Sequence, residues 1–171
     1  MPKPLARLMF QVLVVCTGNT CRSPMAEGIL RAILPPDLTD QVVVLSAGTA
    51  AYDGMPATAY AVQATAERGI DLTGHRSQEL TASMAREADL ILGMDPGHIA
   101  RLLELAPDAA ERTHLITAQG AEAGRAAAQG IADPMGGALD EYDDTFNKIR
   151  SHLLRWLPLI RDAVERSEGV R

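Results

Sequence analysis

The chain has 171 residues, 47% of them hydrophobic and 22% charged, with a formal net charge of −6. These values predict one globular domain over residues 1–171, with mobile ends at 1–9 and 165–171. The negative charge disfavours a nucleic-acid-binding protein, which needs a basic face, and no apolar stretch reaches the length of a membrane span. Two cysteines are too few for a disulfide framework, which favours a cytoplasmic location.

Strand and helix patterns alternate along the chain. Runs rich in β-branched residues predict strands at 12–15 and 42–45, and shorter apolar patterns predict a third strand at 88–92 and a weak fourth at 114–116. Helical spacing and breakers predict helices at 25–34, 57–68, 95–107 and 140–164, the last kinked or split at Pro158. Residues 118–130, rich in Ala and Gly, fit either a loose helix or a long loop.

This alternation predicts an α/β fold. We expect a four-stranded parallel sheet with helices on both faces, doubly wound and flavodoxin-like. Ligands of such sheets bind at the carboxyl ends of the strands. Cys16 is the first residue after the first predicted strand, so it lies at one of these ends.

The segment after that strand has the composition of an anion-binding loop. Gly18 and Asn19 tolerate unusual backbone angles, and the pair Ser23-Pro24 is typical of a helix start. The thiol of Cys16 therefore lies between a strand end and a helix amino terminus, where backbone amides and the helix dipole favour an anion. The same field favours the thiolate and makes Cys16 a candidate nucleophile.

The spacing of Cys16 and Arg22 fits one tetrahedral oxyanion. The five residues between them can curl so that amides point inward, while the Arg22 fork binds two phosphate oxygens. The predicted phosphate loop consists of Thr17, Gly18, Asn19, Thr20, Cys21 and Arg22. The alternative is a buried cysteine in an ordinary strand-to-helix turn.

The loop sequence Cys-Thr-Gly-Asn-Thr-Cys-Arg-Ser-Pro resembles the signature of the low-molecular-weight protein tyrosine phosphatase family, of the bacterial type. The resemblance extends in the family's order over roughly residues 10–158. Its further landmarks are Ser46-Ala47-Gly48, His75-Arg76-Ser77, the strand ending in Met94-Asp95, and Asp133-Pro134.

The resemblance implies a phosphatase that acts on phosphorylated proteins through a phosphocysteine intermediate. It implies Cys16 as nucleophile, Arg22 as phosphate ligand and Asp133 as the acid that protonates the leaving group. Local sequence alone favours a residue that starts a turn before Pro134, and the order of the family's landmarks reverses this preference. No cofactor and no metal are expected, and we expect a monomer or weak dimer.

Several further roles are implied by the resemblance alone. Ser23 would steady the thiolate, although a helix cap is a competing role. Asn19, Ser46 and His75 would hold the strained shape of the loop. Cys21 would form a reversible disulfide with Cys16, or would simply be a small buried residue.

Three positions bear on whether the substrate carries phosphotyrosine or phosphoarginine, and they leave both possible. Thr20 stands where tyrosine-specific members usually have a larger aliphatic residue, and the loop resembles the branch that removes phosphate from protein arginine. Met135 stands where an aromatic wall residue is usual. Tyr52 is placed like the family's other aromatic wall residue, or is a surface tyrosine.

Two rival functions remain at this stage. A thiol-linked arsenate reductase uses a similar loop but needs further cysteines, and none follows Cys21. A non-catalytic phosphoprotein-binding module would keep the loop but would not need Cys16 and Asp133.

Overall fold

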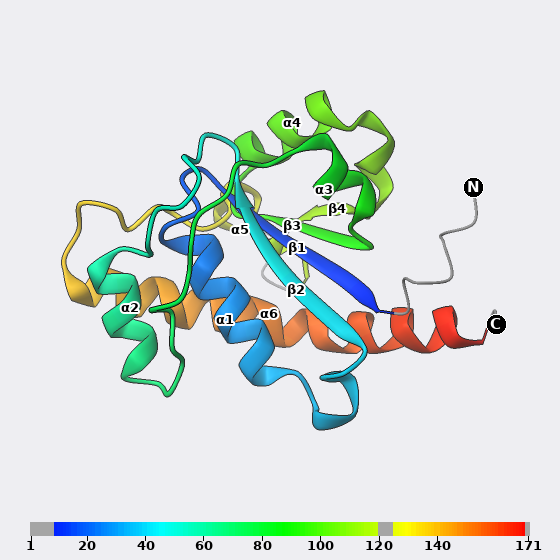
Figure 1. The fold of residues 1–171 in the computed structure, drawn as a ribbon, viewed down its shortest axis with the longest axis horizontal. Coiled ribbons are helices and arrows are strands. Elements are labelled where there is room, and N and C mark those ends of the chain that lie inside the picture. Colours follow the sequence, from blue (N-terminus) through cyan, green and yellow to red (C-terminus); the bar gives the residue numbers. More distant parts are fainter. Residues whose placement is uncertain (1–8, 120–124, 170–171) are drawn as a thin grey trace.

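In a computed structural model of the protein, residues 9–119 and 125–169 are described, and among them four parallel strands form one sheet. The strand order is β2–β1–β3–β4 (Figure 1). The strands are β1 (Phe10–Cys16), β2 (Val42–Gly48), β3 (Leu90–Gly93) and β4 (Thr113–Leu115). The predicted parallel α/β sheet is confirmed.

Helices cover both faces of this sheet (Figure 1). The helices are α1 (Arg22–Ile33), α2 (Ala59–Ala66), α3 (Ala82–Glu87), α4 (Pro96–Leu105), α5 (Arg125–Gln129) and α6 (Leu139–Glu168), with short 3-10 turns at Pro36–Leu38, Pro107–Arg112 and Ile116–Ala118. Helices α1, α2 and α6 lie on one side, and α3 and α4 on the other.

The central strand β1 explains this two-sided core. Successive side chains of a strand point to opposite faces. Val12 and Val14 accordingly pack into the cluster that contains α1 and α6, whereas Leu13 and Val15 pack into the cluster that contains α3 and α4. A strand buried on both faces reads as a continuous apolar run, which is the pattern that marked it in the sequence.

The long helix α6 runs through Pro158 without a break, so the predicted split there is wrong. Pro158 is exposed, and so is Leu154, whose carbonyl lacks its usual helical partner, so the missing hydrogen bond lies on the solvent side of the helix. The opposite face of α6 is buried at a spacing of three to four residues, at Tyr142, Phe146, Ile149, Leu153, Trp156, Ile160 and Val164. The helix continues to Glu168, four residues beyond its predicted end.

Some boundaries differ from the prediction. Cys16 is the last residue of β1 rather than the first residue after it, because β1 pairs with β2 as far as Cys16 opposite Gly48. Helix α1 begins at Arg22 with Cys21 as its cap residue, so Ser23 lies inside the first turn and is not the cap. Within residues 118–130, one short helix, α5, is described, and 120–124 lie outside the described residues.

The sheet order places the loop 16–22 where ligands bind. The chain leaves β1 toward β2 on one side of the sheet, and it leaves the neighbouring strand β3 toward β4 on the other side. Such a switch point opens a crevice at the carboxyl ends of the strands. Both Cys16 and the segment after β3 lie at this end.

Candidate active site

The loop of residues 16–22 is held by its carbonyl groups. The carbonyls of Cys16, Thr17 and Thr20 accept hydrogen bonds from the amides of Thr49, Ala50 and Thr58, at 2.9 Å each. The C=O and the following N–H of a trans peptide point in opposite directions. Carbonyls tied to the surrounding segments therefore turn the amides of Thr17, Gly18 and Cys21 toward the middle of the loop, as an oxyanion cradle requires.

Gly48 makes the close approach between this loop and the end of β2 feasible. A Cβ atom added to Gly48 would lie 2.4 Å from the Thr17 carbonyl oxygen and 2.9 Å from the Asn19 amide nitrogen. Any side chain at this position would push the loop away from β2. The glycine of the Ser46-Ala47-Gly48 landmark thus has a packing reason.

Asn19 is the conformational centre of the loop. Its φ of 53° is in the left-handed region, and the residue is fully buried. Its Oδ1 accepts from the Gln78 amide at 2.9 Å, and His75 Nε2 donates to its carbonyl oxygen at 2.7 Å. Its Nδ2 donates to Ser46 Oγ at 2.9 Å. These contacts hold a backbone conformation that is costly for a residue other than glycine.

A chain of hydrogen bonds runs from Asn19 to the thiol of Cys16. Asn19 Nδ2 also donates to Ser23 Oγ at 2.8 Å, and Ser23 Oγ lies 2.9 Å from Cys16 Sγ. Because Ser23 Oγ accepts from the amide, its own hydrogen is free to donate to the sulfur. Cys16 and Ser23 are both buried, so the donor faces the sulfur away from bulk water.

Glu27 fixes the orientation of the Ser46 hydroxyl, which is the second acceptor of the Asn19 amide. Ser46 Oγ donates to Glu27 Oε2 at 2.5 Å, because a carboxylate only accepts, and Ser46 Oγ is then left to accept from Asn19. Arg31 Nη2 pairs with Glu27 Oε1 at 2.6 Å. The Asn19 amide donates to both serine oxygens, so the Ser46 hydroxyl is directed to Glu27 and the Ser23 hydroxyl to the Cys16 sulfur.

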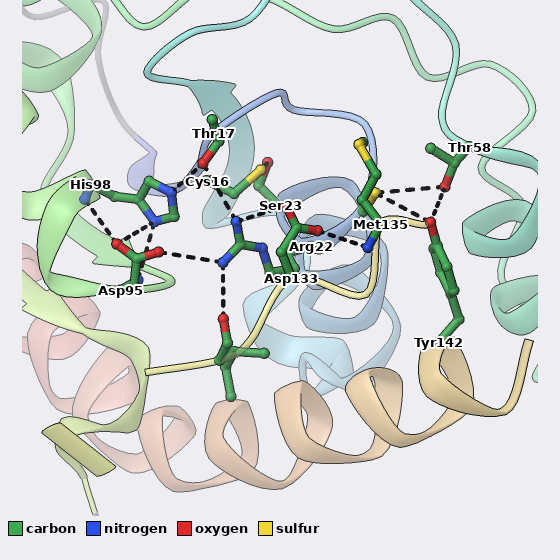
Figure 2. A network of polar contacts seen from close by, with 12 residues as sticks. Cys16, Thr17, Arg22, Ser23, Thr58, Asp95, His98, Asp133, Met135 and Tyr142 are labelled. Atoms are coloured by element: carbon green, nitrogen blue, oxygen red, sulfur yellow. Dashed lines mark hydrogen bonds and ion pairs between the residues drawn. The ribbon is translucent and has the colours of Figure 1, made fainter. Parts of the chain in front are cut away.

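Arg22 is buried and has polar contacts on both sides of its guanidinium (Figure 2). Nη1 donates to the Ile131 carbonyl at 2.9 Å and lies 3.5 Å from Asp95 Oδ2. Nη2 lies 3.4 Å from Asp133 Oδ2 and 3.5 Å from Thr17 Oγ1. Only the Ile131 contact is short, so it is the anchor of the side chain.

Asp133 forms a turn with one carboxylate oxygen and faces Arg22 with the other. Its Oδ1 accepts from the Met135 amide at 3.0 Å, and this hydrogen bond closes a turn around Pro134, as the sequence predicts. Its Oδ2 stays free of this turn and lies at the Arg22 guanidinium. The side chain is 42% exposed, so it can exchange protons with water and with a bound substrate.

A small pocket brings most of the predicted site residues together. Its lining residues are Cys16, Gly18, Thr20, Cys21, Arg22, Asp133 and Met135. Tyr52 is 83% exposed and lies outside the set of described residues that line this pocket. Ser23, Ser46 and His75 support the loop from behind, as their hydrogen bonds show.

Cys21 lies in a second polar cluster, with Thr58 and Tyr142. Its Sγ is 3.6 Å from the Tyr142 hydroxyl and 3.7 Å from Thr58 Oγ1. Burial raises the pKa of the Cys21 thiol, and burial likewise raises the pKa of Tyr142 to about 12. Cys21 is therefore a protonated thiol at neutral pH, which slows any attack that it makes on another sulfur.

Sequence reasoning missed the contacts made by Glu27, Asp95 and His98. Glu27 lies four residues after Ser23 on α1, a spacing that puts both on one helical face. Asp95 and His98 are the cap and third residue of α4, and each binds the backbone amide of the other. The Asp-Pro-Gly-His sequence carries this capping pattern, although His at the third position is not the usual Glu or Gln.

Within residues 9–119 and 125–169, no group of three or more Asp, Glu, Cys or His side chains is placed to hold a metal ion. None of the helices in that part of the chain has the length and apolar character needed to cross a bilayer.

The parallel sheet and the Cys-x5-Arg loop at its switch point define a cysteine-dependent phosphatase. A model of one such family, described as low molecular weight phosphotyrosine protein phosphatase, matches residues 11–168. The chain belongs to this family, and its enzymatic class is that of the low molecular weight protein-tyrosine phosphatases. The predicted family, fold and enzyme class are confirmed.

Known proteins resemble the chain over nearly its whole length. The probable low molecular weight protein-tyrosine-phosphatase EpsP of Ralstonia nicotianae is 37% identical over 88% of this chain and 95% of its own. The structure of Wzb from Vibrio vulnificus in complex with benzylphosphonate is 31% identical, with a TM-score of 0.75 over 88% of this chain and 98% of that one. The YwlE arginine phosphatase from Geobacillus stearothermophilus is also 31% identical, with a TM-score of 0.77 over 90% and 94%.

Proposed function

We propose that the protein removes phosphate from phosphorylated proteins, with Cys16 as nucleophile, Arg22 as phosphate ligand and Asp133 as acid and base. The observation that carries the proposal is the shared pocket, which is lined by the thiol, the guanidinium and the carboxylate. The loop amides and Arg22 supply the charge stabilisation that a transferring phosphoryl group needs.

In the first step the Cys16 thiolate attacks phosphorus, and the bond from phosphorus to the leaving oxygen breaks. Asp133 gives its proton to that oxygen, so a neutral phenol departs rather than a phenolate. The Asp133 turn holds Oδ1 and leaves Oδ2 at the pocket, where the leaving group must exit. The product is phosphocysteine at residue 16.

In the second step water attacks phosphorus and the bond to sulfur breaks. Asp133, now ionised, takes the proton of the attacking water. The leaving group is the Cys16 thiolate, and the Ser23 hydroxyl at 2.9 Å donates to it as charge develops. Phosphate then leaves, and the thiolate is ready for the next cycle.

Asp133→Asn tests the acid. We expect kcat to fall about 10²- to 10⁴-fold with phosphotyrosine peptide and with little change in KM, because proton donation acts in the transition state. The loss should be smaller for substrates whose leaving group has a low pKa. Cys16→Ser, assayed in parallel with EDTA present, should show no turnover. Near-normal kcat in Asp133→Asn would remove this residue from the mechanism.

Phosphotyrosine is the first candidate substrate, since relatives with this printed activity cover the chain. Phosphoarginine is the second candidate, and it is favoured by one observation. Thr20 lines the pocket together with Gly18, and its Oγ1 lies near that glycine, since a Cβ added at Gly18 would be 3.5 Å from it. Such a hydroxyl can accept from a guanidino group or orient the attacking water, which an aliphatic branch cannot do.

Three substitutions at Thr20 separate the effect of the hydroxyl group on substrate preference from the effect of side-chain volume. Thr20→Val keeps the shape and removes the hydroxyl, Thr20→Ser keeps the hydroxyl, and Thr20→Ile adds bulk. For an arginine phosphatase, kcat/KM with phosphoarginine peptide should fall in Val and Ile but not in Ser. If the ratio of the two kcat/KM values, phosphoarginine over phosphotyrosine, is the same in all four proteins, Thr20 does not select the substrate.

We also propose that the protein works as a monomer or weak dimer in the cytoplasm. Both cysteines are free thiols, and a catalytic thiol needs a reducing compartment. Sedimentation at micromolar concentration tests the oligomeric state. A stable dimer or larger assembly would contradict it.

A further inference from the structure

The first turn of α4 carries a buried histidine that the proposed reaction does not use. His98 is 4% exposed, and its Nε2 lies 2.8 Å from Thr17 Oγ1 in the phosphate loop. Its Nδ1 lies 3.1 Å from the Asp95 amide. The ring therefore bridges the cap of α4 and the loop that holds Cys16 (Figure 2).

The hydrogen-bond partners define the tautomer of His98. The backbone amide of Asp95 can only donate, so Nδ1 is the acceptor and carries no hydrogen. The neutral ring then has its hydrogen on Nε2, which donates to Thr17 Oγ1. Burial lowers the pKa of His98, in keeping with a neutral ring.

Both partners of His98 also lie at the guanidinium of Arg22. Thr17 Oγ1 is 3.5 Å from Nη2, and Asp95 Oδ2 is 3.5 Å from Nη1. Asp95 is held in turn by the His98 amide, which donates to Oδ1 at 3.2 Å. His98, Thr17, Arg22 and Asp95 thus form a closed ring of polar contacts.

Capping alone does not account for this arrangement. Glu or Gln at the third helical position serves a capping box, and Nδ1 is the only ring atom that the cap needs. The Nε2 contact reaches an exposed threonine whose χ1 would otherwise be free to choose among rotamers. Fixing that rotamer keeps a hydroxyl on one side of the Arg22 fork, opposite the Asp95 carboxylate.

We propose that His98 is a positioning residue for Arg22. Its Nε2–H holds the Thr17 hydroxyl, its Nδ1 and backbone amide hold Asp95, and the two together keep the guanidinium turned toward the loop amides. The inference rests on the proposed role of Arg22 as phosphate ligand. It predicts that the affinity for a bare oxyanion depends on His98 and Thr17, although neither belongs to the chemistry of the leaving group.

The test measures the inhibition constant of inorganic phosphate against p-nitrophenyl phosphate hydrolysis. Thr17→Val removes the acceptor and keeps the shape, so we expect phosphate to bind about 3- to 10-fold more weakly, the factor that one hydrogen bond supplies. Thr17→Ser should restore binding. His98→Ala should have a similar effect, and the double variant should be no worse than His98→Ala, because both changes break the same contact.

Thr81→Ala controls for the loss of a helix cap. Thr81 Oγ1 accepts from the Met84 amide at the start of α3, away from the pocket, so its removal should lower Tm without changing phosphate affinity.

A spectroscopic readout is the ¹⁵N shift of the His98 ring, which should show the Nε2–H tautomer and change on saturation with phosphate.

The inference is overturned if Thr17→Val binds phosphate as the parent does. It is also overturned if the effects of Thr17→Val and His98→Ala multiply, or if His98→Ala changes phosphate affinity no more than Thr81→Ala. Failure of the proposed function looks different. In that case the parent does not hydrolyse the substrate, or Arg22→Ala binds phosphate as tightly as the parent.

Discussion

Replacement of Ser23 by alanine removes the donor that faces the catalytic sulfur. Ser23 Oγ lies 2.9 Å from Cys16 Sγ and 2.8 Å from Asn19 Nδ2, and the residue is fully buried. The methyl group that remains has nearly the same volume, so the change leaves no large cavity. Its effects therefore arise from two lost hydrogen bonds.

The two lost bonds act on different quantities. A hydrogen bond to a charged group contributes about 1.5–3 kcal/mol, so the expulsion of the Cys16 thiolate from phosphocysteine should slow by about 10- to 150-fold. One hydrogen of Asn19 Nδ2 loses its acceptor, while the other still donates to Ser46 Oγ, and this loss should lower the free energy of unfolding by about 1–3 kcal/mol. Formation of phosphocysteine should suffer less, because the sulfur loses charge in that step.

Stopped-flow hydrolysis of p-nitrophenyl phosphate separates the two steps. In Ser23→Ala we expect a burst of p-nitrophenol equal to the enzyme concentration, followed by a slow steady state. Ser151→Ala, at an exposed position on α6, is the matched control and should behave as the parent. The reasoning is refuted if Ser23→Ala keeps kcat within about twofold of the parent, or if kcat falls without a burst.

Three further changes have expected outcomes. In Cys21→Ser, inactivation by mild peroxide should no longer be reversed by thiol, as mass and activity after dithiothreitol will show; full recovery would exclude a disulfide with Cys16. The folded-state pKa of His98 lies below its unfolded value of about 6.5, so the unfolded chain binds more protons below that pH, and stability falls as the pH drops. Urea unfolding at pH about 7.5 and 5.5 should show a smaller loss in His98→Ala than in the parent, by up to about 1.4 kcal/mol per pH unit, and equal losses would contradict this assignment. Gly130→Ala should lower Tm and the free energy of unfolding by at least about 2 kcal/mol, because φ is +81° and the new Cβ would lie 1.9 Å from the Met94 carbonyl oxygen; unchanged Tm would contradict that geometry.

The parts of the fold that the sequence predicted are those set by local pattern. The run at Val12–Val15 has β-branched residues on both sides of one strand, and burial on both faces follows from it. The end of this strand could not be placed, because the pairing of Cys16 with Gly48 is a contact between distant segments. Pro158 led to the wrong prediction that α6 is split, because the sequence alone does not show that this proline faces solvent.

The site shows the same division. Cys16 and Arg22 are six residues apart on one loop, and their proximity is local. The segment that carries Asp133 is held at the loop by Ile131, whose amide donates to the Met94 carbonyl just after β3 and whose carbonyl accepts from Arg22, and sequence spacing does not reveal these contacts. The contact of His98 with Thr17 was missed for a related reason, because the two residues come together only when β1 and β3 lie side by side, whereas the contact with Asp95 is local.

The outward carbonyls of the phosphate loop have a consequence for the whole molecule. They fasten together the segments after β2, before α2 and at the start of α1, so the catalytic cradle is also a structural joint. We therefore expect that the loop does not lose its structure before the whole domain unfolds. On heating, the loss of phosphatase activity and the loss of folded structure should follow the same transition. No range of temperature should exist in which the domain is folded but the loop is inactive.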